Sequence, residues 1–219
     1  MEVFQNLNIF VPDGIESNFI EKLLDNITKS EWNHKSDFES NYQKNTASED
    51  KIVICIETPN LLFNDVTLKA YVWFRKEEDH FEVFNIVPAK SGSLSFNQYN
   101  FILNKFYELF ITNLREVFNL KIVFSKPNKS IIDFIGEDAA DILIRFSRSA
   151  NKSTGNTNPY DFNRWCDFVF ILYRKEIHLS IGDFERWLIE EEGWSDDMAS
   201  KLGLDLEYAL DILEKYEHN

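Results

Sequence analysis

The segment 145–165, RFSRSANKSTGNTNPYDFNRW, is the stretch of this chain whose residue types most suggest a chemistry. It places four Lys and Arg side chains around a run of Ser, Thr, Asn and Gly, in a chain whose net charge is −14. Cations and the free backbone amides that begin a helix are groups that hold phosphate. The segment therefore predicts a candidate ligand or anion site. Its residues are Arg145, Arg148, Asn151, Lys152, Ser153, Thr154 and Arg164.

The pair Lys152-Ser153 invites comparison with a phosphate-binding P-loop, whose pattern is G-x-x-x-x-G-K-[ST]. Phe146 and Asn151 stand where that pattern needs glycine, and the segment follows an expected helix rather than a strand. The P-loop pattern is therefore absent. Two alternatives to an anion site remain. The cations could complete a helix end and pair with acidic side chains around a polar turn, which the sequence favours, or the segment could dock onto the acidic C-terminal residues.

Other catalytic and metal-binding patterns are missing from the sequence. The four histidines are isolated, and no pair has the HxxxH or HExxH spacing of a zinc site. Cys55 and Cys166 each lie in an apolar stretch, as buried thiols do, and no G-x-S-x-G motif is present. The acidic pair Glu137 and Asp138 suits the first turn of a helix better than a two-metal centre. We predict no catalytic residue, no metal and no cofactor, and the sequence favours a protein that is not an enzyme.

The negative charge is concentrated near the C-terminus. Residues 181–219 hold 12 Asp and Glu against 3 Lys and Arg, whereas residues 91–180 hold 9 against 11. Acidity of this kind repels the nucleic-acid backbone, so general nucleic-acid binding is not expected. The same charge favours a basic protein partner, although acidity also serves simple solubility.

Composition predicts a soluble protein with a large core. Hydrophobic residues make up 44% of the chain and include 20 Phe, while only 7 Gly and 5 Pro are present, which favours long helices. Two cysteines without CxxC spacing suit a reducing compartment. The first residues do not resemble a signal peptide, and the apolar runs are too short to span a membrane. We expect a cytoplasmic protein without membrane association.

The patterns in the first 130 residues predict a mixed unit of strands and helices in the order β-α-β-β-β-α-β. Apolar runs and alternation predict strands over 2–11, 51–58, 66–74, 81–87 and 121–125. In 66–74, alternate residues should face opposite sides of the strand, and one side is expected to carry Val66, Leu68, Ala70, Val72 and Phe74. Asp13 with Glu16 and Ser95 with Gln98 predict two capped helices, and 30–50 predicts a loop or frayed helix.

Helical periodicity continues from residue 137 to the end of the chain. It predicts a helix over 137–150 and a second helix capped by Asn158 with Pro159 at its first position. Gly193 and Gly203 then divide 181–217 into three short helices. The sequence thus predicts an α+β protein with a mostly antiparallel sheet in residues 1–130. Residues 131–219 form a helical domain or subdomain.

The three short helices of 181–217 resemble a UBA-type bundle. Gly193-Trp194 resembles its Gly-aromatic loop, and Ala209-Leu210 its last helix, over less than a fifth of the chain. The resemblance implies that Trp194 and the last helix form a partner-binding surface. Trp187 and Trp194 are accordingly candidate partner-binding residues, with burial in the helical core as the alternative.

Together these patterns predict a non-enzymatic, acidic interaction module that binds a basic protein. Bacterial immunity, antitoxin and anti-phage proteins share this size, acidity and Asn/Lys/Ile/Phe-rich composition. The alternative is a phosphate- or nucleotide-binding protein, and in one version an enzyme, that uses the basic segment 145–165.

Overall fold

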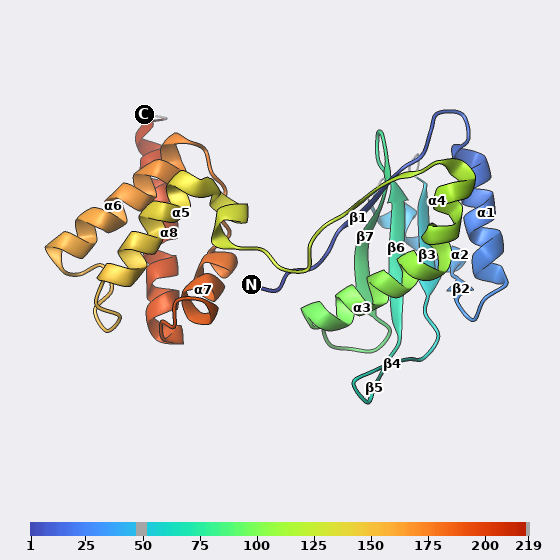
Figure 1. The fold of residues 1–219 in the computed structure, drawn as a ribbon, viewed down its shortest axis with the longest axis horizontal. Helices are drawn as coiled ribbons and strands as arrows, with labels where there is room; N and C mark the ends of the chain where they lie inside the picture. Colours follow the sequence, from blue (N-terminus) through green and yellow to red (C-terminus); the bar gives the residue numbers. More distant parts are fainter. Residues whose placement is uncertain (47–51, 218–219) are drawn as a thin grey trace. The chain divides into compact units, whose positions relative to one another are not determined.

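The computed structural model describes residues 1–46 and 52–217, which form two compact units (Figure 1). One unit spans Glu2–Pro127, and the other spans residues 128–219 together with Met1. The division lies close to the predicted boundary at residue 130. The fold confirms the predicted α+β class, with an antiparallel sheet first and helices after it. Residues 47–50 of the predicted loop, Lys51 of the predicted strand and His218 lie outside the described residues.

A six-stranded antiparallel sheet forms the centre of the first unit, in the order β2-β3-β6-β7-β1-β8. A separate two-stranded hairpin consists of β4 and β5. The strands are β1 (Leu7–Phe10), β2 (Asn33–His34), β3 (Val53–Glu57), β4 (Leu61–Phe63), β5 (Val66–Leu68), β6 (Ala70–Lys76), β7 (Phe81–Pro88) and β8 (Lys121–Phe124).

The predicted strand 66–74 is two strands in the structure. Its second half alternates as expected, and Ala70, Val72 and Phe74 are buried. Val66 is half exposed, contrary to the prediction, because β5 belongs to the small hairpin rather than to the sheet. Asn64 and Asp65 both have positive φ, which a tight two-residue hairpin turn requires.

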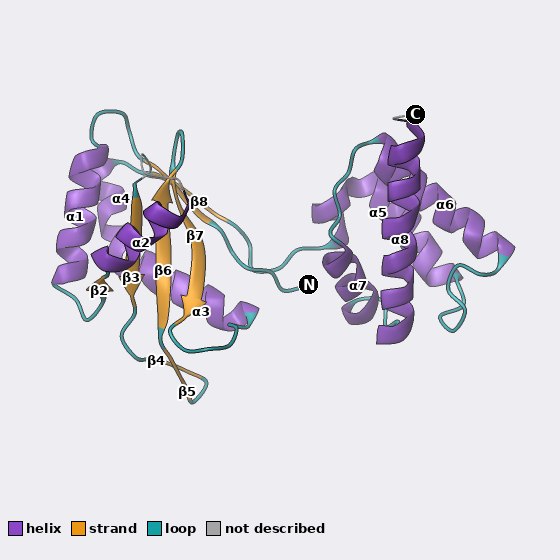
Figure 2. Ribbon diagram, turned by 180° about the vertical axis from the view of Figure 1, so that it is seen from behind, coloured by secondary structure: helices purple, strands orange, loops and turns teal. Residues whose placement is uncertain are grey.

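Helices cover both faces of the sheet (Figure 2). One face carries α1 (Glu16–Thr28), α3 (Phe96–Phe106) and α4 (Thr112–Phe118), with a π-helical turn between α3 and α4. The other face carries α2 (Ser36–Thr46), which formed part of the predicted loop or frayed helix. Aromatic side chains attach α2, since the ring of Phe38 lies 5.0 Å from that of Tyr71 and Tyr42 lies 5.2 Å from Trp73.

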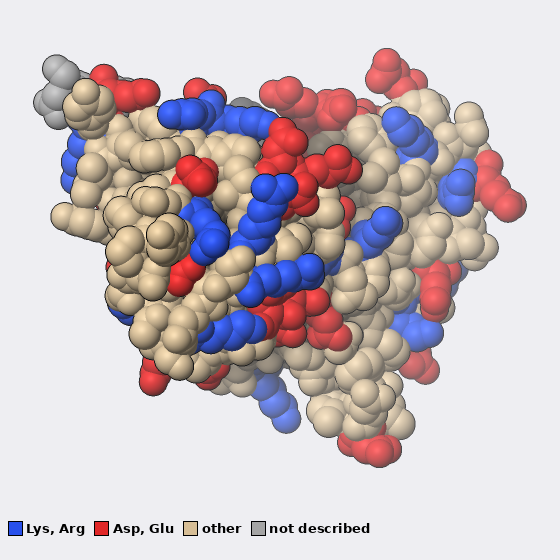
Figure 3. All heavy atoms as spheres, turned by 60° about the vertical axis from the view of Figure 1, so that its left-hand side comes forward, with Lys and Arg blue, Asp and Glu red and all other residues tan. Residues whose placement is uncertain are grey.

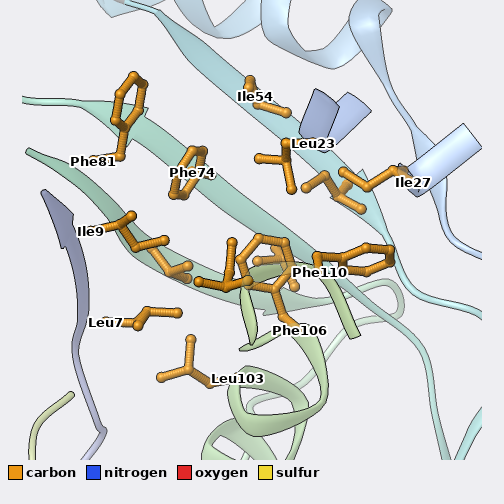
Figure 4. Close-up of a cluster of buried hydrophobic side chains, with 14 of the residues drawn as sticks. Leu7, Ile9, Leu23, Ile27, Ile54, Phe74, Phe81, Leu103, Phe106 and Phe110 are labelled. Carbon is orange, nitrogen blue, oxygen red and sulfur yellow. The ribbon is translucent and has the colours of Figure 1, made fainter. Parts of the chain in front are cut away.

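The core of this unit lies between the sheet and the helices α1, α3 and α4. Figure 4 shows Ile9 and Phe74 of the sheet facing Leu103 and Phe106 of α3, and all four side chains are fully buried. Burying one such side chain stabilises the fold by roughly 1.5–3 kcal/mol. This cluster holds the helices onto the sheet.

One of the two predicted caps is confirmed and the other is wrong. The backbone N–H of Gln98 donates to Ser95 Oγ (3.3 Å), and the N–H of Ser95 donates to Gln98 Oε1 (3.0 Å), as a capping box requires. Asp13 does not cap α1, whose N-terminal flank is Ile15. Gly14, at φ +80°, forms a turn between Asp13 and that flank.

The described residues of the second unit form four helices: α5 (Ile131–Ser149), α6 (Pro159–Arg174), α7 (Ile181–Glu190) and α8 (Asp196–Glu217). Gly136 has φ +77° and kinks α5, so that the predicted start at residue 137 is the start of its second part. Asn158 caps α6 by accepting from the N–H of Tyr160 (3.0 Å), and Pro159 follows it, as predicted. Among the described residues, no helix is both long enough and apolar enough to cross a membrane.

The three short helices expected in 181–217 are two in the structure. α8 continues through Gly203, which is buried inside the helix. A Cβ on Gly203 would lie 2.9 Å from Ile181 Cγ2 of α7 and would overlap Glu185 Oε1 of the same helix. The glycine therefore lets two helices approach closely and does not end one. The segment consequently lacks the third helix of the UBA-type outline.

Candidate functional site

α8 carries apolar side chains on two faces. Its inner face is buried in the unit's core through Leu202 and Leu206, with Ala209, Leu210 and Leu213 partly buried against the same core. Its outer face carries four further apolar residues that are 48% to 81% exposed. These are Leu204, Tyr208, Ile212 and Tyr216, which we call the outer stripe. Four-residue spacing places them along one side of the helix over about 18 Å.

α6 adds a second set of exposed apolar groups beside α8. Phe162 is 51% exposed and Phe170 is 40% exposed, with the partly buried Cys166 midway between them. Together with Ala209 and Ile212 of α8, these residues line an open hollow of about 210 Å³, the α6–α8 groove. No charged residue lines the groove. Contiguous exposed apolar surface of this kind marks an interaction site more often than chance exposure.

Acidic side chains border the outer stripe. Glu207 and Asp211 are exposed on α8 three residues after Leu204 and Tyr208, so they flank that half of the stripe. Glu214 is also exposed, but it lies two residues from both Ile212 and Tyr216 and therefore on the other side of the helix. None of the three carboxylates forms an ion pair with another described residue. Arg174 of α6 lies over the ring of Phe170, 5.7 Å from its centroid. We call the outer stripe, the groove, Glu207 and Asp211 the α6–α8 surface.

A second hollow, of about 330 Å³, adjoins α8 where Leu210 and Glu214 lie. Leu172 and Ile177 contribute apolar side chains to it, and Glu176 contributes a second carboxylate. The Tyr173 hydroxyl donates to the backbone oxygen of Leu213 (3.1 Å), which fastens α6 to α8. Desolvation and the nearby carboxylates of Glu217 and Glu214 raise the pKa of Tyr173, so this hydroxyl stays a neutral donor. The contact keeps the groove between the two helices in place.

The basic segment 145–165 is largely bound by its own unit. Arg148 Nε lies 3.8 Å from the Glu192 carboxylate, and Lys152 Nζ donates to the backbone oxygen of Glu192. The same ammonium lies 5.9 Å from the Trp194 ring centroid. Two of the four cations are thus docked on the acidic connection between α7 and α8, which was one of the alternatives from the sequence.

The other predicted site residues lie apart from that contact. Arg164 pairs with the buried Asp161 of its own helix (2.8 Å), and Arg145 is exposed on α5. The remaining polar residues form a turn, in which Asn151 Oδ1 accepts from the N–H of Ser153 (2.9 Å). Thr154 donates its N–H to the backbone oxygen of Asn151 (3.0 Å).

On the face drawn in Figure 3, Lys and Arg side chains lie beside Asp and Glu side chains rather than in a separate basic area. The contacts of 145–165 thus match a helix end and a polar turn, and an anion site there stays a prediction.

The two candidate partner-binding tryptophans are core residues. Trp187 and Trp194 are each 3% exposed. The indole N–H of Trp194 donates to Ser147 Oγ (2.8 Å), and that hydroxyl donates to Glu192 Oε2 (2.9 Å). The Trp194 ring also stacks on Phe146 with centroids 6.0 Å apart. The prediction that these two side chains form a docking surface is therefore corrected, because the turn at Gly193 directs Trp194 back onto α5.

The described part of the chain contains no assembled site for cysteine or metal chemistry. Burial raises the pKa of the Cys55 thiol to about 12, and partial burial also raises the pKa of Cys166. Both thiols are therefore protonated at neutral pH. Within residues 1–46 and 52–217, no three His, Cys, Asp or Glu side chains are grouped in a way that could hold a metal ion.

The sheet unit has its own hollow, of about 460 Å³, beside the loop that precedes α3. The nearly buried carboxylate of Glu57 lines it and pairs with Lys69 (3.0 Å) and Lys35 (3.3 Å). Hydrogen bonds from Lys69 and Lys35 lower the pKa of Glu57 despite burial. The carboxylate is thus neutralised within the unit, and it is not prepared to accept a proton as a general base.

Sequence reasoning missed the outer stripe because it ended a helix at Gly203. The four-residue period of Leu204, Tyr208, Ile212 and Tyr216 was present in the sequence, but it becomes a stripe only in a continuous helix. Two of the four residues are tyrosines, whose hydroxyl groups made the apolar spacing of the stripe harder to recognise.

Comparison with known proteins gives no relative: no protein-family model, no curated protein and no solved structure matches this chain.

Proposed function

We propose that this protein is a non-enzymatic, acidic interaction module that binds a basic protein through the α6–α8 surface. The supporting observation is the outer stripe of α8, an exposed apolar face flanked at Leu204 and Tyr208 by Glu207 and Asp211, whose carboxylates have no ion-pair partner among the described residues. An apolar face alone would suit many partners. The bordering acids select a partner that carries Lys and Arg around its own apolar residues.

The two parts of the surface would contribute differently to binding. Apolar and aromatic side chains such as Ile212 and Tyr208 supply most of the affinity when a partner buries them. Residues 181–219, with 12 acidic against 3 basic side chains, attract a basic partner over longer range and raise the association rate. The complex should therefore weaken with salt without vanishing, since only the charged part is screened.

The alternative, a phosphate- or nucleotide-binding protein, gains no support from the contacts of 145–165. Protein groups engage Lys152 and Arg164, and Arg148, which is 71% exposed, has one contact 3.8 Å from the Glu192 carboxylate, so a phosphate would compete with these contacts. A role among bacterial immunity, antitoxin or anti-phage proteins stays a prediction, since its basis is size, acidity and composition.

The test is purification of the protein under mild conditions from cells that naturally produce it, followed by native mass spectrometry. Three forms are compared: wild type, Ile212→Glu and Ile132→Glu. Ile132 is a matched control, because it is exposed to a similar degree (45% against 48%) on α5 of the same unit. Both variants lose an exposed isoleucine and gain one negative charge.

We expect a basic polypeptide to accompany wild type and Ile132→Glu and to be lost from Ile212→Glu. Raising the salt from about 50 to about 500 mM should weaken the complex. A partner retained equally by all three forms, or an acidic partner, would contradict the proposal. A bound mass of a few hundred daltons in place of a polypeptide would favour the phosphate or nucleotide alternative.

A further inference from the structure

We infer that the sheet unit binds a small organic phosphate in the hollow of about 460 Å³ beside the loop that precedes α3. The inference concerns the sheet unit alone and does not depend on the α6–α8 surface or on the proposed partner. It is carried by the positive charge that this hollow collects in an acidic chain and by the hydrogen-bond donors around it.

The hollow lies at one end of the six-stranded sheet. β3 and β7 end there and β6 begins there, and Figure 1 shows the β4–β5 hairpin and the loop before α3 at the same end. The lining includes Lys69, between β5 and β6, and residues 89–94, which follow β7. The N–H of Ala89 donates to the backbone oxygen of Lys69 (2.8 Å), which holds these two segments together.

Lysine side chains outnumber carboxylates at this hollow. Glu57 is the acid among the described residues that line it, and its two oxygens pair separately with Lys69 (3.0 Å) and Lys35 (3.3 Å). These three groups together keep one positive charge. Lys90 also lines the hollow and has no ion pair with another described residue. Two positive charges therefore remain at or directly beside the hollow, in a chain whose net charge is −14.

The ion pair between Glu57 and Lys69 positions a cation for a ligand. Glu57 is 8% exposed, and a buried ion pair adds little net stability because its charges must leave water. The pair does fix the ammonium of Lys69 at the wall of the hollow, while 43% of the Lys69 side chain stays exposed. A cation that is held in place before the ligand arrives loses less conformational entropy on binding than a free lysine does.

The charge and the donors match a phosphate group. A phosphate monoester carries about −1.5 to −2 charges at pH 7, whereas a carboxylate carries a single one. Lysine binds phosphate as a point charge. The hydroxyls of Ser91 and Ser93 line the same hollow and form no hydrogen bond with another described residue, so they are available to donate to phosphate oxygens.

The rest of the hollow suits the organic part of such a ligand. Its volume falls in the range of small-molecule sites and exceeds what a phosphate ion fills. Leu68, Tyr71 and Leu94 add apolar and aromatic surface to the lining. The ring of Tyr71 lies 5.0 Å from that of Phe38 on α2, a contact that holds the tyrosine in place.

The test uses three small probes on the full chain: phenyl phosphate, benzoate and inorganic phosphate. Benzoate keeps the ring but carries less charge, and inorganic phosphate keeps the charge but lacks the ring. Titration followed by the backbone amide NMR spectrum measures the affinity of each probe and shows which residues it contacts.

We expect phenyl phosphate to shift the amides of residues 67–71 and 89–94. So small a probe gains little binding energy, so saturation is expected at about 10 mM or below. Benzoate should bind at least about tenfold more weakly because of its lower charge, and inorganic phosphate at least about threefold more weakly because it lacks the ring.

Three variants test the lysines. Lys90→Gln should weaken phenyl phosphate at least about threefold, and Lys69→Gln at least about tenfold, because Lys69 is held at the wall of the hollow. The matched control is Lys126→Gln, which removes an exposed lysine of the same unit that does not line the hollow and should leave the affinity unchanged. Melting curves establish that the variants are folded. If Lys69→Gln unfolds, Ser93→Ala replaces it, with an expected loss of about threefold.

Amide shifts scattered over other parts of the chain would overturn the inference, as would lysine variants that weaken binding no more than Lys126→Gln. Equal affinity for phenyl phosphate and benzoate would overturn it by assigning the hollow to a singly charged ligand. Equal affinity for phenyl phosphate and inorganic phosphate would overturn it by assigning the hollow to free phosphate. None of these outcomes bears on the proposed function, which is tested at Ile212 in the other unit.

Discussion

At the scale of single residues, Glu176 occupies a backbone position that normally favours glycine. It follows the last turn of α6 with φ +51°, and its N–H donates to the backbone oxygen of Tyr173 (3.1 Å). The next N–H, of Ile177, donates to the backbone oxygen of Leu172 (2.9 Å). These two hydrogen bonds define a Schellman motif, whose left-handed residue is most often glycine because a Cβ is strained there.

Glu176→Gly should therefore stabilise the helical unit by about 1 kcal/mol, because it removes that strain. The melting temperature of this unit should rise by roughly 4–8 °C. Thermal unfolding followed by circular dichroism checks the direction and the size of the shift.

The matched control for this prediction is Gly193→Ala. Gly193 also has positive φ, +69°, so a Cβ there should lower the stability by a similar amount. A Glu176→Gly variant that melts below wild type would show that the Glu176 side chain stabilises the unit by more than its backbone strain costs.

Residues whose role depends on nearby sequence could be predicted, and those that depend on distant contacts could not. Ser95 with Gln98 and Asn158 with Pro159 act within one helical turn, so their caps could be read from spacing alone. Trp194 resembled a surface residue in a Gly-aromatic loop. Its burial depends on Ser147 and Phe146, nearly fifty residues earlier, and no local pattern reports that contact.

At the scale of elements, the contact between α7 and α8 depends on the missing side chain of Gly203. An exposed glycine within a helix costs about 1 kcal/mol relative to alanine, so Gly203→Ala would ordinarily stabilise α8. Here the added methyl would collide with Ile181 and with the side chain of Glu185.

We predict that Gly203→Ala lowers the stability of the helical unit by about 1–2 kcal/mol, since overpacking outweighs the gain in helix propensity. Urea unfolding of wild type and variant measures the difference. The double variant Gly203→Ala/Glu185→Ala tests the cause, because removing most of the Glu185 side chain should restore part of the loss. An increase in stability for the single variant would mean that the two helices are not so closely packed.

The same glycine explains why the acidic residues of the candidate site could be predicted from the sequence and the outer stripe could not. The acidic character of 181–217 follows from composition, and it motivates the proposal of a basic partner. The outer stripe needed a continuous helix across Gly203, and the sequence gives no local sign that this glycine is a packing residue. Likewise, the cations of 145–165 were visible, but their shared contact with Glu192 depends on how α5 meets the connection from α7 to α8.

At the scale of the whole molecule, the described residues form two separate hydrophobic cores. The core of the sheet unit includes Phe106, and the core of the helical unit includes Phe168; both side chains are fully buried. The two clusters share no residue. The boundary expected near residue 130 was based on alternation and helical periodicity, patterns that each extend over many residues and tolerate local errors.

We predict that Phe106→Ala and Phe168→Ala each destabilise one unit by about 3–5 kcal/mol, the usual cost of removing a buried aromatic ring. Hydrogen exchange measured by mass spectrometry on peptic fragments should show faster exchange in residues 2–127 for the first variant. It should show faster exchange in residues 128–217 for the second. Equal acceleration in both units by either variant would show that they unfold as one cooperative body.

The two outer strands of the sheet have a consequence for behaviour at high concentration. β2 consists of two residues, and β8 of four that begin with Lys121. The open edge of a sheet is a template on which another chain can add a strand, and a long, uncharged edge leads to aggregation. Both edges here are too short to template much growth, so crowding should not drive these molecules into β-rich fibres through the ordered sheet.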